Sequence, residues 1–372
     1  MPSEADGSFV SGAAAAVLAE ISAHGGALRF DRFMQTALYG ESGFYTTARP
    51  SGARQRTGRA GMGERTGRAG RRGDFLTSPE VGPLFGTVVA QALDAWWHEL
   101  GEPDSFVVVD AGAGPGTLAR SVLAARPACS EALRYVAVEV SADQRATHPE
   151  GIESRAELPT EPFVGVILAN ELLDNLPFRL FVFDSGWKEA FVAHDGSRLV
   201  EVLHHCSSLP QALPERAAHG ARVAICDVAA EWVRTALARM TSGRLVVFDY
   251  VTTTPSMIER PWREWIRTYA HHQRGGHYLS SVGEQDLTVE VPLDQLPAPT
   301  TVSTQTEFLR RFGIDALVAE GKMAWHQQTS APDVAALKLR SRVSEAEALL
   351  DPMGLGAFSV VEWRRHLVES SS

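Results

Sequence analysis

The sequence predicts an α/β fold with a doubly wound, Rossmann-like sheet, a helical N-terminal extension and inserted α+β elements. Apolar runs of strand length lie near residues 107, 135, 164 and 245, and helix-like segments alternate with them. Three of these runs end in polar side chains, at Asp110, Glu139 and Asn170. In doubly wound sheets, ligands bind at the carboxyl ends of the strands. The polar residues therefore fall where a site is expected.

The first strand runs into Asp110 and then three glycines on alternate positions, Gly112, Gly114 and Gly116. A dinucleotide fingerprint is G-x-G-x-x-G, but here Thr117 takes the place of its third glycine. The pattern D-x-G-x-G-x-G resembles that of class I S-adenosylmethionine (SAM) methyltransferases. The resemblance implies that the cofactor's carboxylate lies against N–H groups of the turn, while Asp110 helps to hold the cationic amino end. A glycine-rich turn that binds nothing is the alternative.

A second acid supports the cofactor hypothesis. The strand at residues 134–138 is followed by Glu139. A carboxylate at the end of the second strand of such a unit can accept hydrogen bonds from both ribose hydroxyls. The alternative is an ordinary surface carboxylate. We expect a ribose ligand, because the acid follows a glycine turn at the spacing that this unit requires.

Composition indicates a large globular protein. The chain has 372 residues, 44% of them hydrophobic, enough for one elaborated domain or two. We expect no membrane span, because no apolar run reaches 18 residues, and no signal or transit peptide. Cys129, Cys206 and Cys226 lack the spacing of a disulfide frame or a zinc site. They favour reduced thiols in a cytoplasmic protein.

Residues 49–72 form a segment rich in arginine and glycine. It contains eight arginines against the single acid Glu64, and Arg-Thr-Gly-Arg-Ala-Gly occurs in it twice. With so few apolar residues it cannot offset the entropy of ordering, so we expect a flexible, solvated loop. The chain as a whole carries a net charge of −10, which argues against nucleic acid as the main partner. Binding of nucleic acid or of a partner by the loop is the alternative.

We place a boundary at about residue 103. Residues 1–103 form the helical N-terminal region with the loop 49–72, and residues 104–372 form the Rossmann-like core. Insertions are expected at about 178–222, as hairpins, and at about 252–300, with mixed structure. Helices are predicted at 30–39, 81–100, 118–125, 229–240 and 344–350, with a strand and helix within 302–312; further strands are predicted at 163–169, 244–249 and 358–363.

The strand at 163–169 leads into Asn170, Glu171 and, three residues later, Asp174. In the fold that the glycine motif resembles, this strand end faces the methyl group. Methyl transfer requires a positioned nucleophile and a group to take its proton. Two carboxylates could converge on the planar guanidinium of an arginine. Alternatively, Asp174 or Asn175 only caps a turn that Pro177 ends.

Several sequence motifs are spread along the chain, at residues 33–45, 73–86, 170–177, 248–250, 304–314 and 353–354. With these motifs the chain resembles the MidA family of SAM-dependent methyltransferases from about residue 28 to 364. The family includes a mitochondrial complex I assembly factor that methylates an arginine of a complex I subunit. The resemblance implies SAM as cofactor, an arginine-bearing protein as partner, and a segment 73–80 that folds over the site. The resemblance implies that the cofactor-binding residues of this segment are Gly73, Asp74, Thr77, Ser78 and Glu80.

One stretch departs from the family pattern. The family often has D-I-T-A-H-V-D where this chain has Asp286 to Pro292, without the histidine and the second acid. The departure concerns the acceptor side more than the cofactor. His271, His272 and His277 fit no zinc spacing, so we expect no metal site. A small-molecule methyltransferase and a SAM-binding assembly factor without turnover are the alternative functions.

Overall fold

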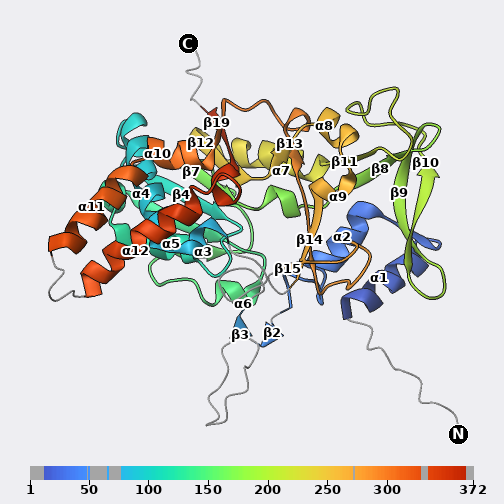
Figure 1. Cartoon of the computed structure of the whole chain (residues 1–372), viewed down its shortest axis with the longest axis horizontal. Helices are drawn as coiled ribbons and strands as arrows, with labels where there is room; N and C mark the ends of the chain where they lie inside the picture. The colour runs from blue at the N-terminus through green and yellow to red at the C-terminus, as the bar shows by residue number, and fades with distance from the viewer. Residues whose placement is uncertain are drawn as a thin grey trace, which may run out of the picture.

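The computed structural model describes residues 12–47, 49–50, 65–66, 77–270, 273–327 and 334–365 (Figure 1). The predicted site residues Gly73 and Asp74 lie outside the described residues, as does most of the segment 49–72. Its described parts are two short strands, β2 (Arg49–Pro50) and β3 (Arg65–Thr66), which pair antiparallel. The flexibility expected of this segment stays a prediction.

A seven-stranded sheet forms the centre of the molecule, in the order β18-β19-β12-β7-β4-β5-β6. The strands from β6 to β12 are parallel, and β19 is antiparallel to both of its neighbours. This confirms the doubly wound sheet. The strands are β4 (Phe106–Ala111), β5 (Leu133–Val138), β6 (Glu153–Arg155), β7 (Phe163–Asn170), β12 (Met240–Asp249), β18 (Thr301–Thr304) and β19 (Ser359–Arg365).

Helices cover both faces of this sheet. Along β4, Val107 and Val109 belong to one apolar cluster and Val108 to the other, because alternate residues of a strand point to opposite faces. A strand buried on both faces is therefore continuously apolar, as the sequence showed. The flanking helices are α3 (Ser78–Val81), α4 (Pro83–Glu99), α5 (Thr117–Ala125), α7 (Asp227–Ala238) and α10 (Gln305–Arg311). Short elements between them are α6 (Ala142–Arg145), η1 (Ala128–Glu131), η3 (Leu293–Gln295) and η4 (Leu355–Ala357).

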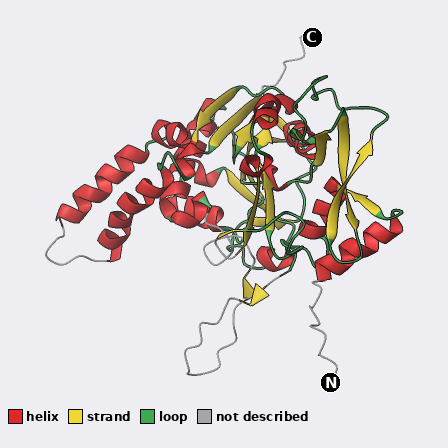
Figure 2. Cartoon of the chain, turned by 45° about the vertical axis from the view of Figure 1, so that its right-hand side comes forward, coloured by secondary structure: helices red, strands yellow, loops and turns green. Residues whose placement is uncertain are grey.

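Two helical predictions need correction. The helix expected at 81–100 is divided at Gly82, and Thr77 makes no side-chain capping bond; instead Glu345 accepts the N–H of Leu84 at 2.8 Å. The helix expected at 344–350 is the end of α12 (Val334–Leu349), which forms a hairpin with the unpredicted α11 (Ile314–Gln327). Apolar residues are not gathered on one face of α12, so periodicity gave no signal. The hairpin extends from the body of the molecule (Figure 2).

A second sheet has the order β1-β9-β8-β11, with β10 paired to β9. It contains the hairpins expected within the insertion at about 178–222, and β1 comes from the N-terminal region. Helices α1 (Gly12–Ala23), which was not predicted, and α2 (Phe30–Tyr39), which was, contact this sheet (Figure 1). Its strands are β1 (Ala27–Arg29), β8 (Arg179–Phe183), β9 (Trp187–His194), β10 (Leu199–His205) and β11 (Arg222–Ile225).

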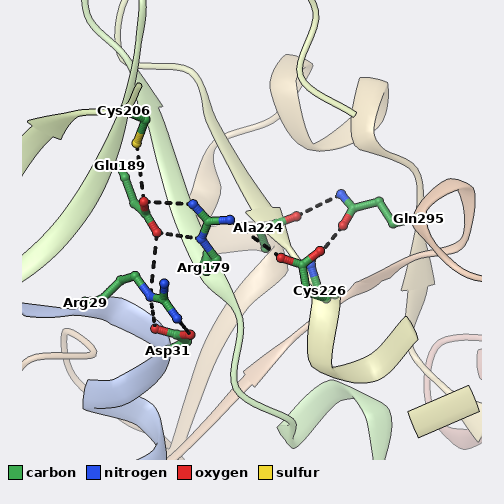
Figure 3. A network of polar contacts seen from close by, with 9 residues as sticks. Arg29, Asp31, Arg179, Glu189, Cys206, Ala224, Cys226 and Gln295 are labelled. Carbon is green, nitrogen blue, oxygen red and sulfur yellow. Dashed lines mark hydrogen bonds and ion pairs between the residues drawn. The ribbon is translucent and has the colours of Figure 1, made fainter. Parts of the chain in front are cut away.

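A network of polar side chains around the buried carboxylate of Glu189 connects the N-terminal region to this sheet (Figure 3). The Glu189 carboxylate accepts two hydrogen bonds from Arg179, at 2.6 and 2.9 Å, and one from the thiol of Cys206 at 3.3 Å. Arg29, just before α2, forms an ion pair with Glu189 at 4.0 Å and with Asp31 at 2.7 Å. A buried carboxylate requires such partners, since its desolvation is otherwise uncompensated. The network thus adds a polar contact between the start of α2 and the second sheet.

The second insertion lies beside the end of β7, and its strand β16 contacts the turn η2 (Leu173–Asn175). Within the described ranges no helix is long and apolar enough for a membrane crossing. The predicted division at residue 103 stays a prediction. The elements of this insertion are β13 (Val251–Thr252), α8 (Thr254–Glu259), α9 (Trp262–Trp265), β14 (Ile266–Ala270), β15 (Gln273–Arg274), β16 (Asp286–Val289) and β17 (Val291–Pro292).

Candidate active site

A cavity of about 460 Å³ lies at the carboxyl ends of β4, β5 and β7. This is the position that the sheet topology assigns to a ligand. Of the described residues predicted for the site, Gly116, Ser78 and Asp174 do not line the cavity. The predicted residues that line it are Thr77, Glu80, Asp110, Gly112, Gly114, Glu139, Asn170 and Glu171.

The glycine turn gives the cavity its floor. Gly114 has φ +53° and Gly116 has φ +78°, conformations that residues with a Cβ rarely adopt. The N–H groups of Gly112 and Ala113 donate to the carbonyl of Val138, at 2.9 and 3.0 Å. These two N–H groups are therefore not directed at a ligand, which corrects the expected role of the turn. The first N–H groups of α5 have no partner within the helix, and Thr117 at its start lines the cavity.

Two carboxylates flank the turn. Asp110 is buried and accepts a hydrogen bond from the Tyr135 hydroxyl at 3.0 Å; burial raises its pKa to about 7. Glu139 accepts the N–H of Gly114 at 3.0 Å and the N–H of Ser141 at 2.8 Å. Burial raises the pKa of Glu139, and these two N–H groups lower it in part. Both acids are thus held with oxygens at the cavity, as binding of an ammonium and of ribose hydroxyls requires.

Two buried oxygen atoms at the cavity lack a donor among the described residues. They are Oε1 of Gln144 and Oδ1 of Asn170. Buried polar atoms in folded proteins are nearly always hydrogen-bonded. The ribose hydroxyls and the ammonium group of SAM are donors, so the cavity fits this cofactor.

Glu171 has an unusual backbone for a residue with a Cβ, with φ +51°. Its N–H donates to the carbonyl of Phe248 at 2.8 Å, and its carboxylate accepts from Asn170 Nδ2 at 3.1 Å. Burial, and then the charge of Asp249, raise the pKa of Glu171 to about 8. Such strained conformations gather at functional sites, where the surroundings impose them. Glu171 therefore presents a basic carboxyl group to the cavity.

Asp174 lies behind the cavity wall, with 2% of its surface exposed. It accepts from Asn175 Nδ2 at 2.8 Å, and its own N–H donates to Asp249 at 3.3 Å. Burial, and then Asp249, raise its pKa well above the usual range. Glu171 and Asp174 therefore do not meet on one side of the cavity, as their spacing had suggested. Asp249, at the end of β12, instead fixes the turn that carries them.

The described part of the segment 73–80 lies against the site. Thr77, Pro79 and Glu80 line the cavity. The Ser78 hydroxyl points elsewhere, since it donates to Gln305 Oε1 at 2.9 Å. The Ser78 backbone lowers the pKa of Glu171 slightly, against the larger effect of burial.

Sequence reasoning missed several lining residues. Tyr39 and Tyr45 line the acceptor side, with rings stacked at 5.4 Å between centroids. Both belong to a motif that carried the family resemblance, which was the only signal for them. Glu157 and Leu158 follow the short edge strand β6, which the sequence did not predict, so nothing indicated their position.

Residues 286–292, the stretch that differs from the family pattern, lie beside the cavity. Asp286 is buried and accepts from the Tyr45 hydroxyl at 2.8 Å. Glu290, at the position of the family histidine, forms ion pairs with Arg260 and Arg267, and it does not line the cavity. The departure thus leaves the cavity wall unaltered. Within the described ranges, no group of three or more His, Cys, Asp or Glu side chains is placed to hold a metal ion.

A doubly wound sheet with a glycine turn after its first strand and an acid after the next is the fold of class I SAM-dependent methyltransferases. Comparison with known families agrees. Residues 88–310, more than half of the chain, match the Methyltransf_28 family of S-adenosyl-L-methionine-dependent methyltransferases. The chain belongs to this family, and SAM is its cofactor.

Among the curated relatives, the mouse and human proteins are named protein arginine methyltransferase NDUFAF7, mitochondrial, and the Drosophila melanogaster protein is named a homolog of it. The mouse protein is 26% identical over 296 residues and the human protein 24% over 292, each covering 66% of this chain and 65% of the relative. The Drosophila melanogaster protein is 50% identical over 54 residues, 14% of this chain and 12% of the relative. This chain thus spans about two thirds of the mammalian relatives. A structure from Burkholderia thailandensis bound to S-adenosyl-homocysteine has the same fold, with a TM-score of 0.79, 24% identity and coverage of 98% and 95%.

Proposed function

We propose that this protein transfers the methyl group of SAM to an arginine side chain of a protein partner. The observation that carries the proposal is the placement of Glu171, which lines the same cavity as Gly112 and Gly114 of the glycine turn. The names of the curated relatives support the same acceptor. When bound, SAM supplies an electrophilic methyl group on a sulfonium.

The residues at the turn hold the cofactor. Asp110 binds the ammonium group, Glu139 binds the ribose hydroxyls, and the start of α5 receives the carboxylate. Gly112 and Gly114 have no side chains, so the space beside the turn stays open for the cofactor. These roles need only small changes of hydrogen bonding, because both acids already line the cavity.

On the acceptor side, Glu171 pairs with the guanidinium, orients one of its nitrogens and takes its proton. A carboxyl group with a pKa of about 8 in the free protein ionises readily once a cation lies beside it. The faces of Tyr39 and Tyr45 provide an aromatic wall that favours a cation. A cavity lined by acidic residues such as Glu80 and Glu171 is poorly suited to an anionic acceptor.

A small molecule as acceptor is the nearest alternative, because the fold does not select the acceptor. The test is mass spectrometry of methylated arginines in cells with and without this protein. We expect one or more protein arginines to lose their methyl groups in the cells that lack it. Unchanged protein arginines together with one missing methylated metabolite would contradict the proposal.

A SAM-binding assembly factor without turnover is the other alternative. It would bind SAM but release no S-adenosylhomocysteine with any protein fraction.

The cellular location is also a proposal: the spacing of the three cysteines favours the cytoplasm, whereas the curated relatives are named mitochondrial. Fractionation of the cells that express the protein tests this.

A further inference from the structure

The backbone of Glu171 is held from both sides. A residue with a Cβ at φ +51° is sterically unfavourable, so it persists only where its surroundings impose it. Its N–H donates to the carbonyl of Phe248 at 2.8 Å, which lies in β12. Its own carbonyl accepts from Nδ2 of Asn175 at 3.0 Å. The side chain of Asn175 is therefore a direct support of the Glu171 conformation.

Asn175 is in turn held by the N-terminal region. The Tyr45 hydroxyl lies between two acceptors, 2.8 Å from Oδ1 of Asn175 and 2.8 Å from Oδ1 of Asp286, and its one hydrogen is shared between them. The Tyr39 hydroxyl donates to the backbone carbonyl of Asn175 at 3.2 Å. The amide group is thus oriented, with its oxygen toward Tyr45 and its nitrogen toward the Glu171 carbonyl and the Asp174 carboxylate. Asn175 is buried, so water does not readily replace these bonds.

We propose that Tyr45 is a positioning residue for Glu171 and acts through the side chain of Asn175. The N-terminal region then sets the geometry of the acceptor site, although it precedes the methyltransferase core in the chain. This inference rests on the proposed role of Glu171. The hydroxyl of Tyr45 carries the effect, because Asn175 Oδ1 and Asp286 Oδ1 both lie 2.8 Å from it.

Substitution Tyr45→Phe tests the hydroxyl alone. The ring stacks on Tyr39 and packs edge-on against Phe44 at 5.1 Å, so the aromatic wall is kept. We expect kcat to fall about tenfold, while SAM affinity by calorimetry stays within about twofold of wild type. The matched control is Tyr278→Phe, which removes another buried hydroxyl that bonds a carboxylate, on Glu201, away from the cavity. This control should keep wild-type kcat.

The decisive comparison is a double-mutant cycle with Glu171→Gln. If Tyr45 acts through Glu171, then Tyr45→Phe lowers kcat about tenfold in the wild-type background and less than twofold in the Glu171→Gln background. An equal loss in both backgrounds would overturn the proposal, because it would mean that Tyr45 contributes independently of Glu171.

A crystal structure of Tyr45→Phe provides a readout that does not depend on the acceptor. We expect Glu171 to leave the left-handed region or its carboxyl group to turn away from the cavity. An unchanged Glu171 would overturn the proposal. If wild-type protein methylates no arginine, the proposed function fails, but the crystal structure still tests whether Tyr45 positions Glu171.

Discussion

The two halves of the cavity wall are built in different ways. The centre of the cofactor half is one stretch of chain, β4 followed by the glycine turn and the start of α5, and Glu139 and Gln144 follow the next strand. The acceptor half joins distant segments, since Tyr45 contacts Asn175, 130 positions away, and Asp286, 241 positions away. Neighbouring residues can be recognised as a motif in the sequence, whereas contacts between distant segments cannot. The difference predicts that substitutions in the two halves have separable effects on cofactor binding and on turnover.

The largest effect is expected in the cofactor half. Gly114→Val should abolish SAM binding, with a loss of at least about 100-fold, because a branched residue at φ +53° is strained and its Cβ would lie 3.2 Å from Oε1 of Gln144. Calorimetry measures the affinity. The control is Gly151→Val. Gly151 has φ +84°, and an added Cβ would have no atom within 4 Å, so this variant introduces the backbone strain at a position that does not line the cavity. A folded Gly114→Val protein with near-normal affinity would remove the turn from the cofactor site.

A smaller effect is expected from substitution of Asp174, which lies behind the acceptor side of the cavity. Asp174→Asn should raise the KM for the acceptor less than threefold and leave SAM affinity unchanged, because Asp174 is buried and does not line the cavity. Steady-state kinetics on a verified acceptor measure this. An increase in KM of tenfold or more would place Asp174 in contact with the acceptor, in one clamp with Glu171.

Stability should depend on pH through both halves. Burial raises the pKa of Glu171 to about 8 and those of Asp110 and Asp249 to about 7. The folded protein therefore binds more protons than the unfolded chain between the ordinary carboxyl pKa values and these raised ones. The stability that this protonation contributes is complete below about pH 4 and is lost as the pH rises through 7 and 8. Each group contributes at most about 1.4 kcal/mol per pH unit.

Thermal melting of the protein without SAM, at pH 6 to 8.5, measures this dependence. We expect the melting temperature of the wild-type protein to fall as the pH rises. The melting temperature of Glu171→Gln should fall less steeply, because this variant has lost one of the carboxyl groups whose pKa is raised. A melting temperature that rises over this range, or parallel curves for the two proteins, would mean that Glu171 is ionised in the folded state throughout.

The smallest effect is expected from the arginine-rich segment. Deletion of residues 52–72 should leave SAM affinity and melting temperature nearly unchanged, since its composition offers little apolar surface to bury. Calorimetry and thermal melting check this. A loss of SAM affinity would add the segment to the cofactor half of the wall.

Much of the fold could be predicted because buried parallel strands such as β4 and β7 are continuously apolar and amphipathic helices such as α2 are periodic. Helix α12 and the edge strand β6 lack these signals, so tertiary contacts decide them. In the site, the spacing of Glu171 and Asp174 suggested one clamp, which would require a continuous helical turn. In the structure Glu171 has a left-handed backbone, and Glu171 lines the cavity whereas Asp174 does not.

The contrast between the halves is tested most directly by wild-type protein and Glu171→Gln, each given SAM with a labelled methyl group and protein from cells that lack this enzyme. We expect both to bind SAM equally, and wild type to place the label on guanidinium nitrogens of arginine. Glu171→Gln should do so about 100-fold more slowly, because glutamine keeps the shape but supplies neither the charge nor the base. Equal rates of labelling by the two proteins would contradict the account of the acceptor half.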